Sequence, residues 1–176
     1  MIQYRECRSE ELSRELFSDF QRRQNVTKCW RKIDGEWLIK DISFADDWTE
    51  QDYSALIACL NNTILTDGVV FGAFLDGRLK GFASVESTRF GTDRQYMDLS
   101  SIHVSQDMRG KGIGKELFCR AKEYAKKHEA QKLYISAHSS VESQAFYRAL
   151  GCVEADEYNA DHVEREPFDC QLECRL

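Results

Sequence analysis

The alternation of apolar and polar positions along the chain predicts a sheet with helices packed on it. Short apolar runs and period-two alternation, bounded by Asp-Gly or glycine-rich turns, predict strands. We expect strands over residues 2–7, 26–33, 36–42, 69–75, 78–88, 95–104, 132–137, 152–158 and 168–174. The second and third of these form a hairpin around Asp34-Gly35. Residues 44–48 are expected to form a loop.

Apolar residues spaced three and four apart predict four helices between these strands. The first covers residues 9–20, and the second begins after a Thr49 cap. The third covers about residues 112–128. Ser139 and Glu142 match a capping box for the fourth, which ends at Gly151. Helices and strands in this order predict an α/β fold with a mixed sheet.

Composition restricts the class of protein further. The 176 residues are 42% apolar and carry no low-complexity run, which favours a single globular domain over disorder. No apolar run reaches the roughly 20 residues that span a bilayer. With no signal-peptide pattern at the start, we expect a cytoplasmic protein that does not bind membranes. The net charge of −6 disfavours binding to a nucleic acid and permits a cationic substrate.

The cysteines and histidines do not form a recognisable metal site. Seven cysteines are scattered without a CxxC pair, and reduced thiols that fill the core explain them. The histidines show no ligand spacing either; they are His103, His128, His138 and His162. We therefore expect no metal.

A glycine-rich segment follows the strand expected over residues 95–104. Gly110, Gly112 and Gly114 occupy every second position after Arg109, directly before the third helix. Glycine lets a ligand approach the backbone closely, and the first N–H groups of a helix attract anions. The segment is typical of a phosphate-binding loop.

Nucleotide-binding loops fit this segment poorly. A Walker loop would need glycine at Arg109 and a hydroxyl residue at Glu116. A dinucleotide fingerprint would need glycine at Lys115 and an opening βαβ unit. A purely structural loop would not need three alternating glycines, which cost conformational entropy.

Two motifs at this spacing resemble the GCN5-related N-acetyltransferase (GNAT) superfamily. Arg109-Gly-Lys-Gly-Ile-Gly114 matches the family's [QR]-x-x-G-x-[GA] loop, after Ile102-His-Val104. The segment Ser140 to Cys152 matches the family's second motif, with Phe146, Tyr147 and Gly151 in place. Ser140 replaces the usual asparagine, and Ser143 the usual alanine. The resemblance covers about residues 68–158.

The resemblance implies a GNAT-like, mostly antiparallel central sheet flanked by helices. Acyl-CoA would enter a wedge where the family's fourth and fifth strands splay apart. Residues 1–67 would form a variable, substrate-side portion, 68–158 the acyl-CoA-binding core and 159–176 a C-terminal strand. The co-substrate would be acetyl-CoA, held at Ile102, His103, Val104, Arg109, Gly110, Lys111, Gly112, Ile113, Gly114, Ser140 and Tyr147.

Several of these assignments have alternatives. Ser140 would contact the pantetheine arm or simply cap a helix, and Lys115 would contact a phosphate or only solvent. The resemblance makes Tyr147 the acid that protonates the leaving thiolate, while a packing role is the alternative. A phenol has a pKa of about 10 and stays protonated at neutral pH.

The general base is not fixed by the sequence. Asp98 alternates onto the same face as Ile102 and Val104, which makes it one candidate, and an acid at this offset serves some relatives. Glu86 on the preceding strand is the second candidate. His138 is a third, and a water chain without a single base is a further alternative. By the same alternation, His103 faces away from Asp98 and is structural.

The family transfers acetyl directly to an amine, so the resemblance implies an N-acetyltransferase acting on a primary amine. Aromatic and acidic residues in the variable part suit a small cationic metabolite or antibiotic, although ordinary packing and capping also explain them. They are Trp30, Trp37, Trp48, Asp46, Asp47, Glu50 and Asp52. The alternatives are acetylation of a protein lysine or N-terminus, and a non-catalytic CoA-binding sensor. A homodimer is compatible with these features.

Overall fold

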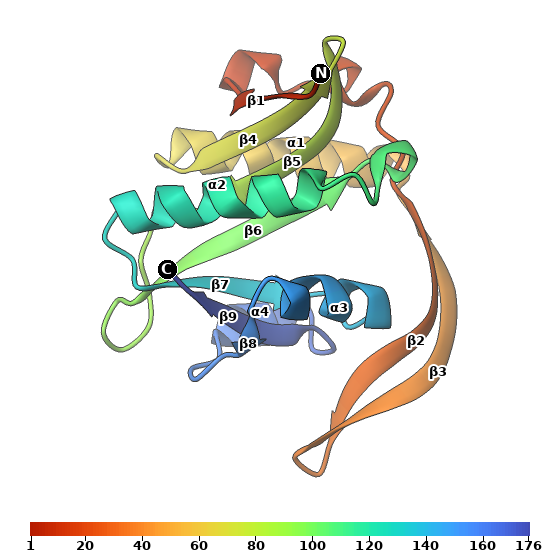
Figure 1. The fold of residues 1–176 in the computed structure, drawn as a ribbon. Helices are drawn as coiled ribbons and strands as arrows, with labels where there is room; N and C mark the ends of the chain where they lie inside the picture. Colours follow the sequence, from red (N-terminus) through yellow and green to blue (C-terminus); the bar gives the residue numbers. More distant parts are fainter.

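A seven-stranded sheet forms the centre of the computed structural model, which describes residues 1–176 (Figure 1). Across the sheet the strands are β1 (Gln3–Glu6), β4 (Val69–Leu75), β5 (Arg78–Val85), β6 (Tyr96–Val104), β7 (Lys132–Ala137), β9 (Cys170–Arg175) and β8 (Val153–Glu154). Neighbouring strands are antiparallel except β6 and β7, which are parallel. The expected fold, a mostly antiparallel central sheet flanked by helices, is confirmed.

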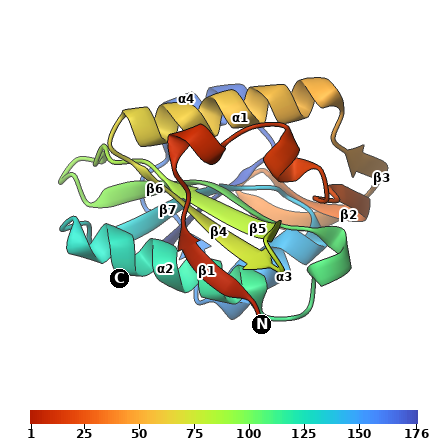
Figure 2. The same cartoon turned by 90° about the horizontal axis from the view of Figure 1, so that it is seen from above.

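Helices cover both faces of this sheet (Figure 2). α1 (Glu50–Leu65) and α4 (Ala160–Arg165) lie on one face, and α2 (Ile113–Lys127) and α3 (Val141–Ala149) lie on the other. The larger core cluster joins the α2 stripe of Ile113, Leu117 and Ala121 to the sheet, because these residues recur at helical spacing. A second cluster lies beneath α1. None of the helices is long and apolar enough to span a membrane.

The two parallel strands diverge after a short paired region. Only Tyr96, Met97 and Asp98 of β6 pair with β7, opposite Lys132, Leu133 and Tyr134. Beyond them, β6 stays paired with β5 on its other side, and its edge toward β7 is open. A β-bulge accompanies the divergence: Ser101 pairs with Ser84 and Leu99 with Val85, which leaves Ser100 as the extra residue.

The hairpin around Asp34-Gly35 is confirmed but is longer than expected. β2 (Arg23–Ile33) and β3 (Glu36–Asp47) form a separate two-stranded sheet that curves away from the central sheet (Figure 1). Residues 44–47, expected in a loop, continue β3 because they pair with Arg23 to Val26. The hairpin touches the core where Cys29 bridges Ser140 and the Trp30 N–H donates to the Ser139 carbonyl.

Two helical predictions need correction. Residues 9–20 form two short 3₁₀ turns, η1 (Ser9–Glu11) and η2 (Glu15–Phe17), instead of one helix. Of the apolar stripe Leu12, Leu16 and Phe20, Leu12 and Phe20 are buried and Leu16 is partly buried, while Phe17, outside the stripe, is fully buried. The capping box is also misplaced by one residue, since Ser140 is the cap and accepts from the Ser143 N–H.

The C-terminal segment also differs from the expectation. Of residues 152–158 only β8 is a strand, and residues 159–176 contain α4 as well as β9. Asn159 caps α4, because its side-chain oxygen accepts from the Asp161 and His162 N–H groups. Asparagine is a preferred residue at this position before a helix. β9 inserts between β7 and β8, which brings its first residues to the divergence of β6 and β7.

Candidate active site

A cavity of about 900 Å³ occupies the divergence of β6 and β7. Its walls come from the open edge of β6, the glycine loop, the start of α3, the C-terminal half of β7 and the base of the hairpin. Residues from both faces of the sheet line it, so it reaches through the sheet between the two strands. The acidic and basic residues in its lining are Arg22, Asp46, Arg109, Lys115, Glu142, Glu166 and Asp169.

The glycine loop has the backbone geometry of an anion site. It follows η3 (Gln106–Met108) and runs into α2. Gly110 and Gly112 have φ values of 75° and 80°, a left-handed conformation that favours glycine. A Cβ at either position would meet no protein atom within 4 Å, so the loop's surface is open to a ligand.

The amides of this loop have no partners within the protein. None of the N–H groups from Gly110 to Lys115 donates to a backbone carbonyl, and the first helical bond is made by the Glu116 N–H. A row of free amides at a helix N-terminus matches the negative oxygens of a pyrophosphate. Gly114 has a different purpose: a Cβ there would lie 3.1 Å from Phe146, so glycine allows α2 to approach α3.

Tyr147 projects from α3 into the cavity. Its side chain is largely buried, packs against Phe118 and Phe146, and has no hydrogen-bond partner for its hydroxyl. Burial is the main reason that the pKa of the phenol lies well above its usual value, and the charge of Asp169 adds to it. The hydroxyl is therefore a free, protonated donor at neutral pH.

Comparison with known sequences identifies this arrangement. A sequence model described as the acetyltransferase (GNAT) family matches residues 28–152. The chain belongs to the GNAT family. It is an acetyl-CoA-dependent acetyltransferase, as the two motifs indicated. No curated protein sequence matches this GNAT chain significantly.

Several solved GNAT-fold structures are similar to it. A proposed streptothricin acetyltransferase from Bacillus anthracis, in complex with acetyl coenzyme A, has a TM-score of 0.72 at 18% identity, covering 100% of each chain. Nourseothricin acetyltransferase has a TM-score of 0.66 at 16% identity over 98% of this chain and 95% of that one. PaiA N-acetyltransferase from Thermoplasma acidophilum, with coenzyme A, has a TM-score of 0.62 at 17% identity over 100% and 99%. At these identities the likeness establishes the fold.

Most residues predicted to hold the co-substrate line the cavity of this GNAT domain. Ile102, His103, Val104, Arg109, Gly110, Gly112, Ile113 and Gly114 do so, together with Lys115. The Arg109 Nε lies 3.3 Å from the Val104 carbonyl, and the Lys111 ammonium turns back toward the Asp107 carbonyl. Ser140 is fully buried, accepts from Gln24 and the Ser143 N–H, and is not in the lining, which favours its alternative role as a cap. Ser143 lines the cavity in its place.

The bulge at Ser100 changes which residues of β6 share a face. Leu99 packs in the α2 cluster, as do Ile102 and Val104 beyond the bulge. Asp98 instead bonds to His162 of α4, with 2.7 Å between its Oδ2 and the imidazole Nε2. The prediction that Asp98 faces the same way as Ile102 and Val104 is wrong, because the extra residue inverts the alternation.

Neither predicted carboxylate lines the cavity. Asp98 is held by His162, and its Oδ1 is buried without a partner. Glu86 accepts from the Thr63 hydroxyl at 2.7 Å and from the Ser100 hydroxyl at 2.5 Å. Ser100 lines the cavity, so Glu86 contacts the cavity wall only through its hydrogen bond with the Ser100 hydroxyl.

Two histidines do face the cavity. His103 packs against Trp48 at 4.8 Å and Phe82 at 5.3 Å, on the same sheet face as Asp98 and not opposite it as predicted. Burial, reinforced by the charge of Arg22, lowers the pKa of His103 to about 3, so the ring is neutral. His138 accepts the Ser140 N–H through Nδ1, which leaves its Nε2 as the protonated, donating nitrogen.

The hairpin contributes the rest of the wall. Arg22 pairs with Asp46 at 2.6 Å and lies over the Trp48 ring. Arg22 and Trp48 line the cavity together with Gln24, Asn25 and Asp46. Four other predicted acceptor-side residues make contacts outside the cavity. Trp30 packs on Arg148, and the Trp37 indole N–H donates to Glu154. Asp52 helps to cap α1, and Glu50 forms an ion pair with Arg14.

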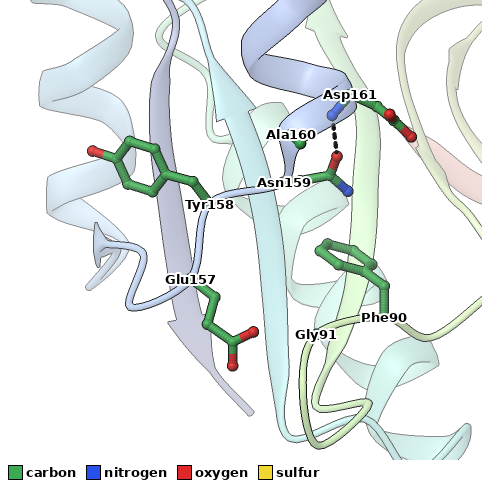
Figure 3. A pocket seen from close by; sticks show the side chains of 7 residues that line it. All are labelled: Phe90, Gly91, Glu157, Tyr158, Asn159, Ala160 and Asp161. Atoms are coloured by element: carbon green, nitrogen blue, oxygen red, sulfur yellow. Dashed lines mark hydrogen bonds between the residues drawn. The ribbon is translucent and has the colours of Figure 1, made fainter.

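Sequence reasoning missed the lining residues from the second half of the sheet. These are Ser136 on β7, Glu166 after α4 and Asp169 just before β9. No local pattern distinguishes them, since only the insertion of β9 beside β7 brings them to the cavity. A separate hollow of about 240 Å³ lies between Phe90-Gly91 and residues 157–161, and none of the predicted site residues lines it (Figure 3).

Proposed function

We propose that this GNAT acetyltransferase transfers the acetyl group of acetyl-CoA to a primary amine on a small cationic acceptor. The observation that carries this proposal is the distribution of charge around the cavity. The glycine loop supplies free amides with Arg109 and Lys115, whereas the segment between α4 and β9 supplies Glu166 and Asp169. One end therefore suits phosphate and the other suits an ammonium group.

The donor side of the cavity fits CoA. The amides from Gly110 to Lys115 would bind the pyrophosphate, and Arg109 would add charge. The open edge of β6, including Ile102 and Val104, would pair with the extended pantetheine arm as an added strand does. Ser143 at the start of α3 takes the place near the arm that the sequence suggested for Ser140.

Tyr147 would act on the leaving group. Its hydroxyl is free and protonated, and Tyr147 lines the same cavity as Asp169. Donation of this proton to the departing sulfur makes CoA a better leaving group, because a thiol leaves more readily than a thiolate.

The similar structures support a small acceptor. Two of them are named for streptothricin and nourseothricin, and we infer the same class of acceptor here because the cavity's acidic wall would hold a cationic group. The acceptor would enter from the face of Trp48 and His103.

The test is release of CoA thiol from acetyl-CoA in the presence of separate amines. We expect turnover with nourseothricin or spermidine and little with a lysine-containing peptide, followed by mass spectrometry of the product for one added acetyl group. Turnover only with the peptide would contradict the small acceptor. Tight CoA binding without turnover on any amine would contradict the enzymatic proposal and favour a sensor.

A further inference from the structure

Asp169 is a cavity carboxylate that the fold positions through an uncharged hydrogen-bond donor. It lies just before β9, is half-buried, and its Oδ2 accepts from the Ser136 hydroxyl at 3.0 Å. Unlike Asp98 and Glu86, it is part of the cavity wall. We propose that Asp169 is the general base that accepts the proton of the acceptor amine, an assignment that rests on the proposed N-acetyltransferase function.

A buried chain of hydrogen bonds orients this carboxylate. The Gln171 amide donates to the Ser136 oxygen at 3.0 Å, so the Ser136 proton points toward Asp169. The Gln171 oxygen accepts from the Tyr134 hydroxyl at 2.5 Å, and that hydroxyl accepts from the Asn159 N–H at 2.9 Å. Gln171 and Tyr134 are almost completely buried. Buried polar groups are costly unless satisfied, and this chain satisfies each one while fixing Asp169.

The other candidate bases are less suitable, and Asp46, which also lines the cavity, is paired with Arg22 at 2.6 Å. Asp98 and Glu86 are outside the lining. His138 presents a protonated Nε2, because its Nδ1 accepts a backbone N–H. His103 is too weak a base to hold an amine proton, since its pKa is about 3. Glu166 lines the cavity, but it is exposed and no side chain fixes it.

The surroundings of Asp169 make its carboxylate more basic, which suits a general base. Burial is the largest influence and raises the pKa of its carboxyl, and the Glu166 charge adds to this. The Ser136 hydrogen bond opposes it, as do the imidazoles of His138 and His162 when they are protonated. On the α3 side, Tyr147 faces the same carboxylate, whose charge helps to keep the phenol protonated.

The proton balance is complete with these two residues. Asp169 takes one proton from the bound ammonium, and the neutral amine attacks the thioester carbonyl. The C–N bond forms, the C–S bond breaks, and the sulfur takes the Tyr147 proton. The second N–H proton restores Tyr147 through solvent, and Asp169 releases its proton to solvent. The products are one amide, one CoA thiol and one free proton.

The test compares D169N with wild type over about pH 5.5 to 9, using nourseothricin and spermidine as acceptors. For the wild type, kcat/KM should fall on the acid side as the carboxylate is protonated. For D169N, kcat should fall roughly 100-fold or more, as loss of a general base does. The logarithm of its residual rate should rise linearly with pH, because only free amine from solution reacts. Acetyl-CoA affinity, measured by calorimetry, should stay within a factor of two.

Further variants separate a chemical role from a structural one. D169E should recover part of kcat, and S136A should move the acid-side fall of the rate to higher pH, since it removes a bond that favours the charged carboxylate. D161N, which removes an exposed carboxylate of α4 outside the cavity, should match wild type. A D169N enzyme with the kcat and pH profile of wild type would overturn the assignment of Asp169 as the base and would leave the proposed function standing. A wild type that acetylates neither acceptor would contradict the proposed function and the assignment together.

Discussion

Asp98 of β6 and His162 of α4 form a hydrogen-bonded pair on one face of the sheet, with 2.7 Å between the carboxylate Oδ2 and the imidazole Nε2. Both side chains are largely buried beneath α4, and His162 stacks on Tyr134. The pair joins β6 to α4 beside the point where β6 and β7 diverge. The carboxylate that the sequence suggested as a base therefore serves to hold the C-terminal helix in place.

This pair predicts a specific dependence of stability on pH. The hydrogen bond to Asp98 raises the pKa of His162 above 6.5 in the folded protein. The stabilisation that protonated His162 gains from Asp98 is therefore fully present below about pH 6.5, and it is lost as pH rises through the pKa of His162 in the folded protein. We expect urea unfolding to show wild type losing more stability than H162Q between pH 6 and pH 8.5. The exposed His128 gives the control, because H128Q should follow wild type; an H162Q profile parallel to wild type would refute the linkage.

A second prediction concerns the hydroxyl of Tyr147. Tyr147→Phe removes only that oxygen and keeps the packing against Phe118 and Phe146. We expect kcat to fall by roughly 10- to 100-fold with acetyl-CoA affinity unchanged, since loss of a general acid affects the transition state. Steady-state thiol release and calorimetry measure the two quantities. Tyr158→Phe, at an exposed tyrosine outside the cavity, is the matched control. Equal kcat values for the two variants would rule out the acid role.

The glycine loop allows a third prediction with a close control. Gly112 and Gly77 have φ values of 80° and 79°, and a Cβ at either would meet no protein atom within 4 Å. Alanine at each should cost about 1–2 kcal/mol of stability through the left-handed backbone. Only Gly112→Ala should also weaken acetyl-CoA binding, by tenfold or more, because its methyl group projects where the pyrophosphate would lie. Calorimetric titration distinguishes them, and equal affinities would exclude Gly112 from the site.

The parts of the site that local sequence determines were predictable. Glycines at a strand-to-helix junction and the apolar stripe of α2 are local features, so the loop and its helix follow from residues 102–128 alone. The bulge at Ser100 is not local, because it depends on pairing with β5, and it reversed the predicted face of Asp98. The place of Asp169 in the cavity could not be predicted from the sequence either, because it depends on β9 entering the sheet beside β7.

The same distinction explains the errors at the two ends of the chain. Leu12 and Phe20 were correctly placed in the core, yet the spacing of the apolar residues could not distinguish a helix from two 3₁₀ turns. The strand expected over residues 152–158 ends at Glu154. Its polar side chains instead reach neighbouring segments, as Glu157 does to Thr92 and Gln95.

A last prediction tests how closely α2 must approach the sheet to position the loop. A Cβ on Gly81 of β5 would lie 2.8 Å from Cγ2 of Ile113, the first residue of α2, and 3.1 Å from Leu117. Gly81→Ala should therefore cost about 1–3 kcal/mol by overpacking. It should also weaken acetyl-CoA binding, because the strain falls on the helix start that carries the loop. Combining it with Ile113→Ala removes the clashing atom, so the double variant should be more stable than the sum of the two single effects predicts. Urea unfolding of all four proteins measures this coupling, and simple additivity would show that the contact does not set the position of α2.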